Sequence, residues 1–346
     1  MRIVLGQTQD IDDDFLTYAK QLGITGVQVN TPRLPGNGYW ELSAIQALVK
    51  KCEKAGVTLE AIEGIPISFY DRVMLGLPGR DDQLEKVAKT IRNIGLAGVR
   101  YLGYHFMPLS VWRTARAAVG RGGAYVTVFD AAKIDEAIQN GTLLISRRDL
   151  TSDHDSFIAQ PVRDVQYKIT AAQMWNNFEY FVRSLGPVVK EAGIIMALHP
   201  DDPPVPDLMG IARIFSTPES LLRATDMVPN GHWKILLCLG TVSEMGGAAA
   251  VYKSITMLGG DRIAYVHMRD VKGFGDRFEE CFIGEGNYDP YEALKLLKQV
   301  EFEGFIMDDH VPHIVGDTAY NHRSRAYAIG YLQALINRVE AEANLR

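Results

Sequence analysis

Short apolar runs alternate with amphipathic stretches along the whole chain. Eight of these runs have the length, the aliphatic content and the flanking turn residues of buried strands. The expected strands are Arg2–Leu5, Thr25–Val29, Val57–Ile62, Val99–Leu102, Ile194–His199, Lys234–Leu237, Ile263–Val266 and Gly304–Met307. Such continuous apolar runs are typical of strands that are buried on both faces, as in a parallel sheet.

Segments with apolar residues at helical spacing separate the apolar runs. The expected helices are Asp12–Leu22, Glu41–Ala55, Asp82–Leu96, Trp175–Ala192, Pro218–Ala224, Glu244–Leu258, Pro290–Val300 and Arg323–Ala341. The first of them opens with three aspartates, which the helix dipole favours in a first turn. The alternation predicts an α/β fold of the (β/α)8 TIM-barrel type, with one domain over residues 1–346.

One region interrupts this alternation. Roughly seventy residues separate the fourth expected strand from the helix at Trp175, far more than a usual βα loop. We expect residues 105–170 to form an insertion over the carboxyl-end face of the barrel, with a short helix at Ala131–Asn140. Such an insertion serves as a lid, a substrate clamp or a subunit contact, and a functionless surface elaboration is the alternative.

Composition narrows the class of protein. Charged residues make up 23% and hydrophobic residues 47% of the chain, as in ordinary globular enzymes. The net charge of −6, without a basic run, argues against nucleic-acid binding. Three scattered cysteines are too few for a disulfide framework and indicate a reducing compartment. No apolar run approaches the roughly 18 residues of a membrane span, and the chain opens on a strand, so we expect a cytoplasmic protein.

Four consecutive expected strands end in side chains that bind divalent metals: His199, Cys238, His267 and Asp309. They lie roughly 30 to 40 residues apart, the length of one strand–helix unit. In a parallel barrel all carboxyl ends open onto one face, so these side chains should converge there. Two imidazoles, a thiolate and a carboxylate suit Mn²⁺, Fe²⁺, Co²⁺ or Zn²⁺. Each residue alone is more often structural, so the metal interpretation rests on the set of four.

Several segments carry a family resemblance: L-E-A-I-E-G-I-P at Leu59–Pro66, W-x-N-x-E-Y-F at Trp175–Phe181, H-P-D-D-P-P at His199–Pro204, L-C-L-G at Leu237–Gly240 and H-x-R-x-V-K at His267–Lys272. With them the chain resembles the mannonate dehydratases of the xylose-isomerase-like barrel group over nearly its full length. The resemblance implies a lyase that dehydrates a D-mannonate-like sugar acid to a 2-keto-3-deoxy acid. It also implies a catalytic divalent ion, Mn²⁺ first, on the four strand-end residues.

The chain departs from the family pattern at three places. The family's R-P-D-H-G-R is replaced by Met307–Pro312, which keeps Asp309 and His310 but has neither arginine and adds Asp308. The family's D-W-T-R-T is shortened to V-W-R-T at Val111–Thr114, and its F-x-E-T-x-H loses the histidine near Phe278–Phe282. These changes concern the substrate more than the fold or the metal.

Dehydration requires a base, an acid and positive charge aimed at the developing enediolate. His310 is the first candidate for proton transfer because histidine titrates near neutral pH, and a purely orienting role is the alternative. Tyr327, which matches a family tyrosine, is a candidate proton donor to the leaving hydroxyl, or else a packed aromatic residue. Asp201 is a candidate that supports catalysis beside His199, although Asp before a proline-rich turn also has a plain turn role.

Four further residues are candidates for substrate binding. Arg113 and Lys272 would pair with a carboxylate, and solvated surface charge is the alternative. His105 follows the fourth strand and should face the same mouth. Asp202 would contact the substrate or the metal-bound water.

Two other functions compete with the lyase. A metal-dependent sugar isomerase or epimerase would stabilise the same kind of enediolate, and the missing arginines would suit its neutral substrate. A non-catalytic binding protein is the third hypothesis, and a complete ligand set speaks against it. As partners we expect a small sugar acid and further copies of the chain, in a homodimer or larger homo-oligomer.

Overall fold

The computed structural model describes residues 1–145, 168–229 and 231–343. Eight parallel strands form its central barrel, in the order β1-β16-β13-β12-β9-β4-β3-β2. Their bounds are β1 Arg2–Ile3, β2 Gly26–Asn30, β3 Thr58–Glu63, β4 Tyr101–Tyr104, β9 Ile195–Leu198, β12 Trp233–Cys238, β13 Ile263–Met268 and β16 Phe305–Asp308. Each of these strands overlaps one of the expected strands. The predicted (β/α)8 fold class is therefore confirmed.

Backbone hydrogen bonds at Leu5 close the barrel between β1 and β2. The Leu5 amide donates to the Gly26 carbonyl at 3.1 Å, and the Gln28 amide donates to the Leu5 carbonyl at 2.8 Å. Leu5 and Val27 thereby form a parallel bridge. Closure leaves the barrel sheet without an exposed edge.

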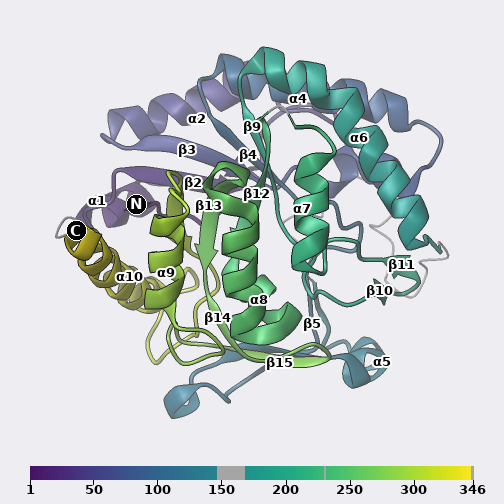
Figure 1. Ribbon diagram of the computed structural model, residues 1–346. Coiled ribbons are helices and arrows are strands. Elements are labelled where there is room, and N and C mark those ends of the chain that lie inside the picture. The colour runs from purple at the N-terminus through teal and green to yellow at the C-terminus, as the bar shows by residue number, and fades with distance from the viewer. Residues whose placement is uncertain (146–167, 230, 344–346) are drawn as a thin grey trace.

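Helices surround the barrel (Figure 1). Their bounds are α1 Asp13–Gln21, α2 Leu42–Lys54, α3 Asp71–Leu75, α4 Arg80–Leu96, α5 Ile134–Gln139, α6 Ala171–Ala192, α7 Pro218–Asp226, α8 Leu239–Arg262, α9 Pro290–Gln299 and α10 His322–Ala343. Side-chain caps explain several starts: Asp12 accepts the Phe15 amide of α1, and Thr217 forms a capping box with Ser220 at α7. The helix expected at Ala131–Asn140 is a 3₁₀ turn followed by α5.

Two apolar layers hold the fold together. Inward-facing side chains fill the barrel, where the rings of Tyr265 and Phe305 stack with their centroids 4.6 Å apart. A larger core lies between the sheet and the helices. Because the interior is filled with side chains, the barrel is a packed core and its chemistry is confined to the strand ends.

A small antiparallel sheet stands beside the barrel, and we call it the accessory sheet. It runs in the order β14-β15-β7-β6. Its strands are β14 Asp270–Phe274, β15 Arg277–Cys281, β7 Val126–Asp130 and β6 Ala115–Ala117, and the separate pair is β5 Trp112–Arg113 with β8 Leu144–Ile145. Figure 1 shows β5, β14, β15 and α5 gathered on one side of the molecule. Two segments far apart in the sequence thus build one structure.

The expected insertion at 105–170 supplies β5 to β8 of these elements, and its residues 146–167 lie outside the described residues. The β14–β15 hairpin, which was not expected, follows β13 instead. A second short hairpin pairs β10 Asp207–Leu208 with β11 Ile211–Ala212. Among the described helices, none combines the length and the apolar character that crossing a membrane requires.

Candidate metal centre and substrate cavity

A cavity of about 540 Å³ opens at the carboxyl ends of the barrel strands. This volume lies in the range of small-molecule sites. One part of its lining comes from the barrel, including Asn30, Glu63, His199, His267 and Asp309. Another part comes from the insertion, namely Val111, Arg113, Arg116, Thr127, Leu144 and Ile145. The cavity therefore lies between the barrel and the inserted strands.

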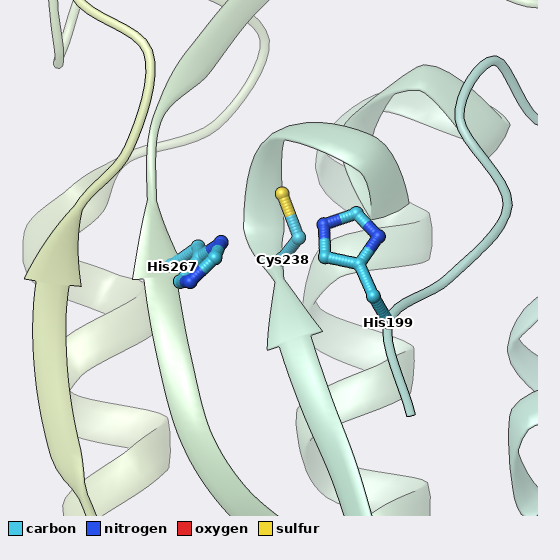
Figure 2. Close-up of side chains that lie close together, drawn as sticks. All are labelled: His199, Cys238 and His267. Carbon is cyan, nitrogen blue, oxygen red and sulfur yellow. The ribbon is translucent and has the colours of Figure 1, made fainter. Parts of the chain in front are cut away.

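Three of the predicted ligands lie together at this end of the barrel. Their ligand atoms, from His199, Cys238 and His267, all lie within 4.8 Å of one another, and all three residues are buried. Figure 2 shows the two imidazoles on either side of the thiol. They follow β9, end β12 and belong to β13, which are neighbouring strands of the barrel. Parallel pairing thus brings together residues that are distant in the sequence.

The histidines are arranged as metal ligands require. His199 Nδ1 lies 2.6 Å from the Pro200 carbonyl, which can only accept, so Nδ1 carries the proton and the lone pair is on Nε2. Neither ring nitrogen of His267 makes a well-aligned hydrogen bond within the described part of the chain. Carboxylates flank the ring, with Glu63 Oε2 3.0 Å from Nε2 and Asp309 Oδ2 3.8 Å from Nδ1. Burial lowers the pKa of His267, but these two carboxylates outweigh it and raise that pKa well above its usual value.

Cys238 lies in surroundings that favour the thiolate. Burial opposes ionisation, but the Arg269 guanidinium and the adjacent imidazoles of His199 and His267 outweigh it and lower the pKa of Cys238 to about 5. The Thr241 amide and hydroxyl also donate to Sγ, at 3.5 and 3.2 Å. A thiolate is the form that binds metals. Two imidazoles and a thiolate therefore form a metal site of suitable chemistry.

Asp309 lies beside these three residues. Its Oδ2 is 3.8 Å from both Cys238 Sγ and His267 Nδ1, and it accepts a hydrogen bond from Arg269 Nε at 3.0 Å. The carboxylate is thus adjacent to the cluster while it is held by a guanidinium. Its role as the fourth ligand stays a prediction.

Two buried arginines organise the carboxylates around the site. Arg269 donates to Asp202 Oδ2 at 2.8 Å and to Glu244 Oε1 at 2.7 Å. Arg113 pairs with both oxygens of Asp202 and reaches Glu244 at 3.3 Å and Glu280 at 3.2 Å. Burial raises the pKa of Asp202, but the two guanidinium groups outweigh it and hold that pKa far below its usual range. These pairs form a continuous network, of which Arg113 and Asp202 belong to the cavity lining.

His310 lines the cavity and is held from behind by Glu280. Its Nδ1 lies 2.6 Å from Glu280 Oε1, and its Nε2 is 3.8 Å from Asp309 Oδ1. The side chain is 38% exposed, so the ring reaches solvent in the cavity. Burial lowers the pKa of His310, but the Asp309 and Glu280 carboxylates outweigh it and raise that pKa above its usual value.

The substrate-binding candidates are divided by the structure. Arg113, His105 and Asp202 line the cavity, whereas Lys272 does not. Lys272 projects from β14, 4.0 Å from Glu285, with 44% of its side chain exposed. His105 stands with its ring centroid 4.8 Å from that of His199.

Two catalytic candidates also lie apart from the cavity lining. Tyr327 is 43% exposed on α10, where its ring stacks on Tyr331 and meets the edge of Phe282. Asp201 is buried and accepts the Phe215 amide at 2.7 Å. The carboxylate is thus held by the backbone 14 residues further along the chain, and a catalytic role for Asp201 stays a prediction.

Some residues of the site were not singled out from the sequence. Glu63 ends β3, with Oε2 3.0 Å from His267 Nε2. Arg269 follows His267 by two positions. Glu63 and Arg269 each lie at or just after the end of an apolar strand run, and this position could have identified them in the sequence. Glu280 carries no such signal, because it reaches His310 from the unexpected hairpin.

The structure is thus a closed (β/α)8 barrel whose carboxyl end brings together two imidazoles and a thiol that could hold a metal ion. The family model that matches this chain is that of D-mannonate dehydratase (UxuA), over residues 5–346. The chain belongs to the D-mannonate dehydratase family.

Relatives with this name align along most of the chain. The mannonate dehydratase of Streptococcus agalactiae serotype III is 30% identical over 316 residues, which cover 88% of this chain and 89% of the relative. That of Lactococcus lactis subsp. cremoris is 30% identical over 334 residues and covers 92% of both chains. The family resemblance noted in the sequence is confirmed.

Solved structures agree. The crystal structure of mannonate dehydratase from Streptococcus suis serotype 2 superimposes with a TM-score of 0.83 at 26% identity, covering 99% of this chain and 96% of that one. The D-psicose 3-epimerase of Clostridium cellulolyticum H10 has a TM-score of 0.61 at 13% identity, covering 97% and 99%. The latter likeness concerns the fold alone.

Proposed function

We propose that this protein is a metal-dependent hydro-lyase that dehydrates a sugar acid of the D-mannonate type to a 2-keto-3-deoxy acid. Two observations together carry the proposal: the family model spans residues 5–346, and His199, Cys238 and His267 cluster at a cavity in the size range of small-molecule sites. Relatives named mannonate dehydratase are hydro-lyases by that name.

The reaction removes the proton on the carbon next to the carboxylate and expels the neighbouring hydroxyl as water. The resulting enol then tautomerises to the 2-keto-3-deoxy acid. His199, Cys238, His267 and, as the proposed fourth ligand, Asp309 would hold a divalent ion. The bound ion would supply a Lewis acid for the negative charge that develops on the substrate. We propose Mn²⁺, with Fe²⁺, Co²⁺ and Zn²⁺ as alternatives, since the nitrogen, sulfur and carboxylate donors accept all of them.

We assign proton transfer to His310. The Glu280 carboxylate accepts the Nδ1 proton at 2.6 Å, which leaves Nε2 for the substrate in the cavity. This arrangement resembles the orienting partner of other catalytic histidines. His105 and Asp202 remain substrate contacts in the proposal because both line the cavity.

We further propose that the insertion at 105–170 covers the substrate as part of a single domain. In support, Val111, Thr127 and Leu144 of the insertion line the same cavity as the strand-end residues. Covering a bound sugar excludes water from the developing charge. We keep the cytoplasm and a homo-oligomer as expectations, and sedimentation analysis would test the second.

An isomerase is the less favoured function. The D-psicose 3-epimerase structure shares only the fold with this chain, at 13% identity, whereas the dehydratase family model spans residues 5–346. Both reactions would use the same strand-end ion, so the products decide between them.

Mass spectrometry of Mn²⁺-loaded protein with D-mannonate, its stereoisomers and neutral ketoses tests the proposal. Loss of one water from a sugar acid, with a keto product trapped by semicarbazide, is the expected result. The Cys238→Ser variant serves as the inactive control. An isobaric product from a neutral sugar, without dehydration of any acid, would move the protein to the isomerases.

A further inference from the structure

A sugar-acid enzyme needs positive charge near its substrate's carboxylate. Arg113 and Lys272, which were expected to supply this charge, have other partners or positions in the structure. Arg113 is 3% exposed and pairs with Asp202, Glu244 and Glu280. Its guanidinium therefore neutralises protein carboxylates and has little capacity for a substrate. Lys272 lies outside the cavity lining.

Asp308, which stands where the family pattern has a proline, does not oppose an anionic substrate. It is fully buried, and its Oδ2 accepts a hydrogen bond from Arg325 Nη1 at 2.6 Å. Arg325 also donates to the Asp309 carbonyl at 2.9 Å. The added negative charge is thus paired inside the protein, away from the cavity lining.

Two other arginines line the cavity. Arg33 follows β2 of the barrel, and Arg116 lies on β6 of the accessory sheet, so they approach from different structural units. Both are exposed, and within the described residues neither has an ion-pair partner. Arg33 Nη2 has only a long contact with Gln9 Oε1, at 3.5 Å. Besides the histidines, the described lining contains three basic side chains, Arg33, Arg113 and Arg116. Of these, Arg113 is paired with carboxylates, whereas Arg33 and Arg116 are not.

We propose that Arg33 and Arg116 together form the anion subsite that binds the carboxylate of the sugar acid. The inference rests on the proposed function. In it, Arg33 and Arg116, from other elements, take the place of the family arginines that are missing around His310. Guanidinium groups suit a carboxylate because their planar donors match its two oxygens.

The position of the subsite also gives the insertion a part in specificity. Arg116 stands opposite Thr127 in the β6–β7 pairing, and both line the cavity. Selection of acids over neutral sugars would therefore depend on the accessory sheet, whereas the ion-binding residues belong to the barrel alone.

Calorimetric binding and steady-state kinetics of Arg33→Ala, Arg116→Ala and the double variant test the proposal, with D-mannonate and its uncharged carboxamide as probes. Each single variant should raise the Kd and KM for D-mannonate about tenfold or more, and the double variant further. Affinity for the carboxamide should hardly change. Because exposed charges are screened, salt should weaken D-mannonate binding to the wild type and affect the double variant much less.

Arg277→Ala is the matched control, since Arg277 is an exposed arginine of the same accessory sheet that does not line the cavity. It should leave both affinities unchanged. Unaltered D-mannonate affinity in the double variant, with dehydration intact, would overturn the subsite alone. Failure of the wild type to dehydrate any sugar acid would overturn the proposed function. If the wild type dehydrates no sugar acid but binds sugar acids, and the variants bind them more weakly, the subsite would still be supported.

Discussion

Single residues of this site acquire their chemistry from contacts that only folding provides. Cys238 has an ordinary thiol in the chain, but Arg269 and two imidazoles stabilise its thiolate after folding. His310 changes in the same way, because Glu280 fixes which ring nitrogen carries the proton. The residue type therefore decides whether a side chain can ionise or transfer a proton. Its neighbours in the fold decide which protonation state or tautomer is present.

Removing one metal ligand should remove the metal. We expect Cys238→Ser and His199→Ala to lose most bound Mn²⁺ and nearly all activity while the circular dichroism spectrum stays that of the barrel. Cys52→Ala, at a buried cysteine of α2, should keep its metal. Metal analysis after gel filtration provides the measurement, and stoichiometric metal in either ligand variant would refute the ligand set.

Glu280 should act on the reaction through His310. Glu280→Ala removes the acceptor of the Nδ1 proton, and we expect kcat to fall about 10- to 100-fold with bound metal and KM little changed. Glu280→Gln keeps an acceptor oxygen and should recover a large part of this loss. Equal kcat values in the two variants would show that orientation of the ring is not the role of Glu280.

At the scale of elements, the barrel strands were predictable and the accessory sheet was not. Each barrel strand is a continuous apolar run, since both of its faces are buried. The β14–β15 hairpin begins at Asp270, directly after β13 and its following residue Arg269, and its partner β7 lies far away in the sequence. Short strands that pair over such a separation leave little local signal.

The close approach of α8 to the end of β13 has a testable consequence. A methyl group added at Gly240 would overlap the Arg269 side chain, which its carboxylate partners hold in place. We expect Gly240→Ala to destabilise the protein by about 2 kcal/mol or more and to weaken metal binding. Gly330→Ala, in α10 with open space around it, should instead stabilise by about 0.5–1 kcal/mol. Urea denaturation of both variants measures the difference, and equal effects would contradict the explanation.

At the scale of the whole molecule, the buried ion pairs join the barrel to the accessory sheet. Arg113 of β5 contacts Asp202 beyond β9, Glu244 of α8 and Glu280 of β15. Breaking a buried pair leaves an uncompensated charge, which is costly. The assembly should therefore depend on the ionisation of its carboxylates.

Acid should weaken the fold through this network. Burial raises the pKa of Glu280, but His310 and the two arginines outweigh it and lower that pKa to about 2. Because the folded value lies below the unfolded value of about 4.3, the stabilisation is present above pH ~4.3 and is lost as the pH falls towards 2. Its full size is about 3 kcal/mol.

The stability of Glu280→Gln should accordingly approach that of the wild type as the pH falls from about 5 to 2. Chemical denaturation at several pH values measures this convergence. Glu279→Gln, on the same strand and without an ion pair in the described residues, is the control. A constant difference between wild type and Glu280→Gln across this range would refute the assigned pKa.

Local patterns in the sequence were sufficient to predict the barrel, the succession of its strands and the convergence of His199, Cys238 and His267. These features follow from local periodicity and from the rule that parallel strands end on one face. The tertiary structure alone decided which charged residues meet. It engaged Arg113 in ion pairs, left Tyr327 and Lys272 outside the cavity lining, and joined Glu280 to His310. Those outcomes depend on pairings between distant segments, which no local pattern of residues encodes.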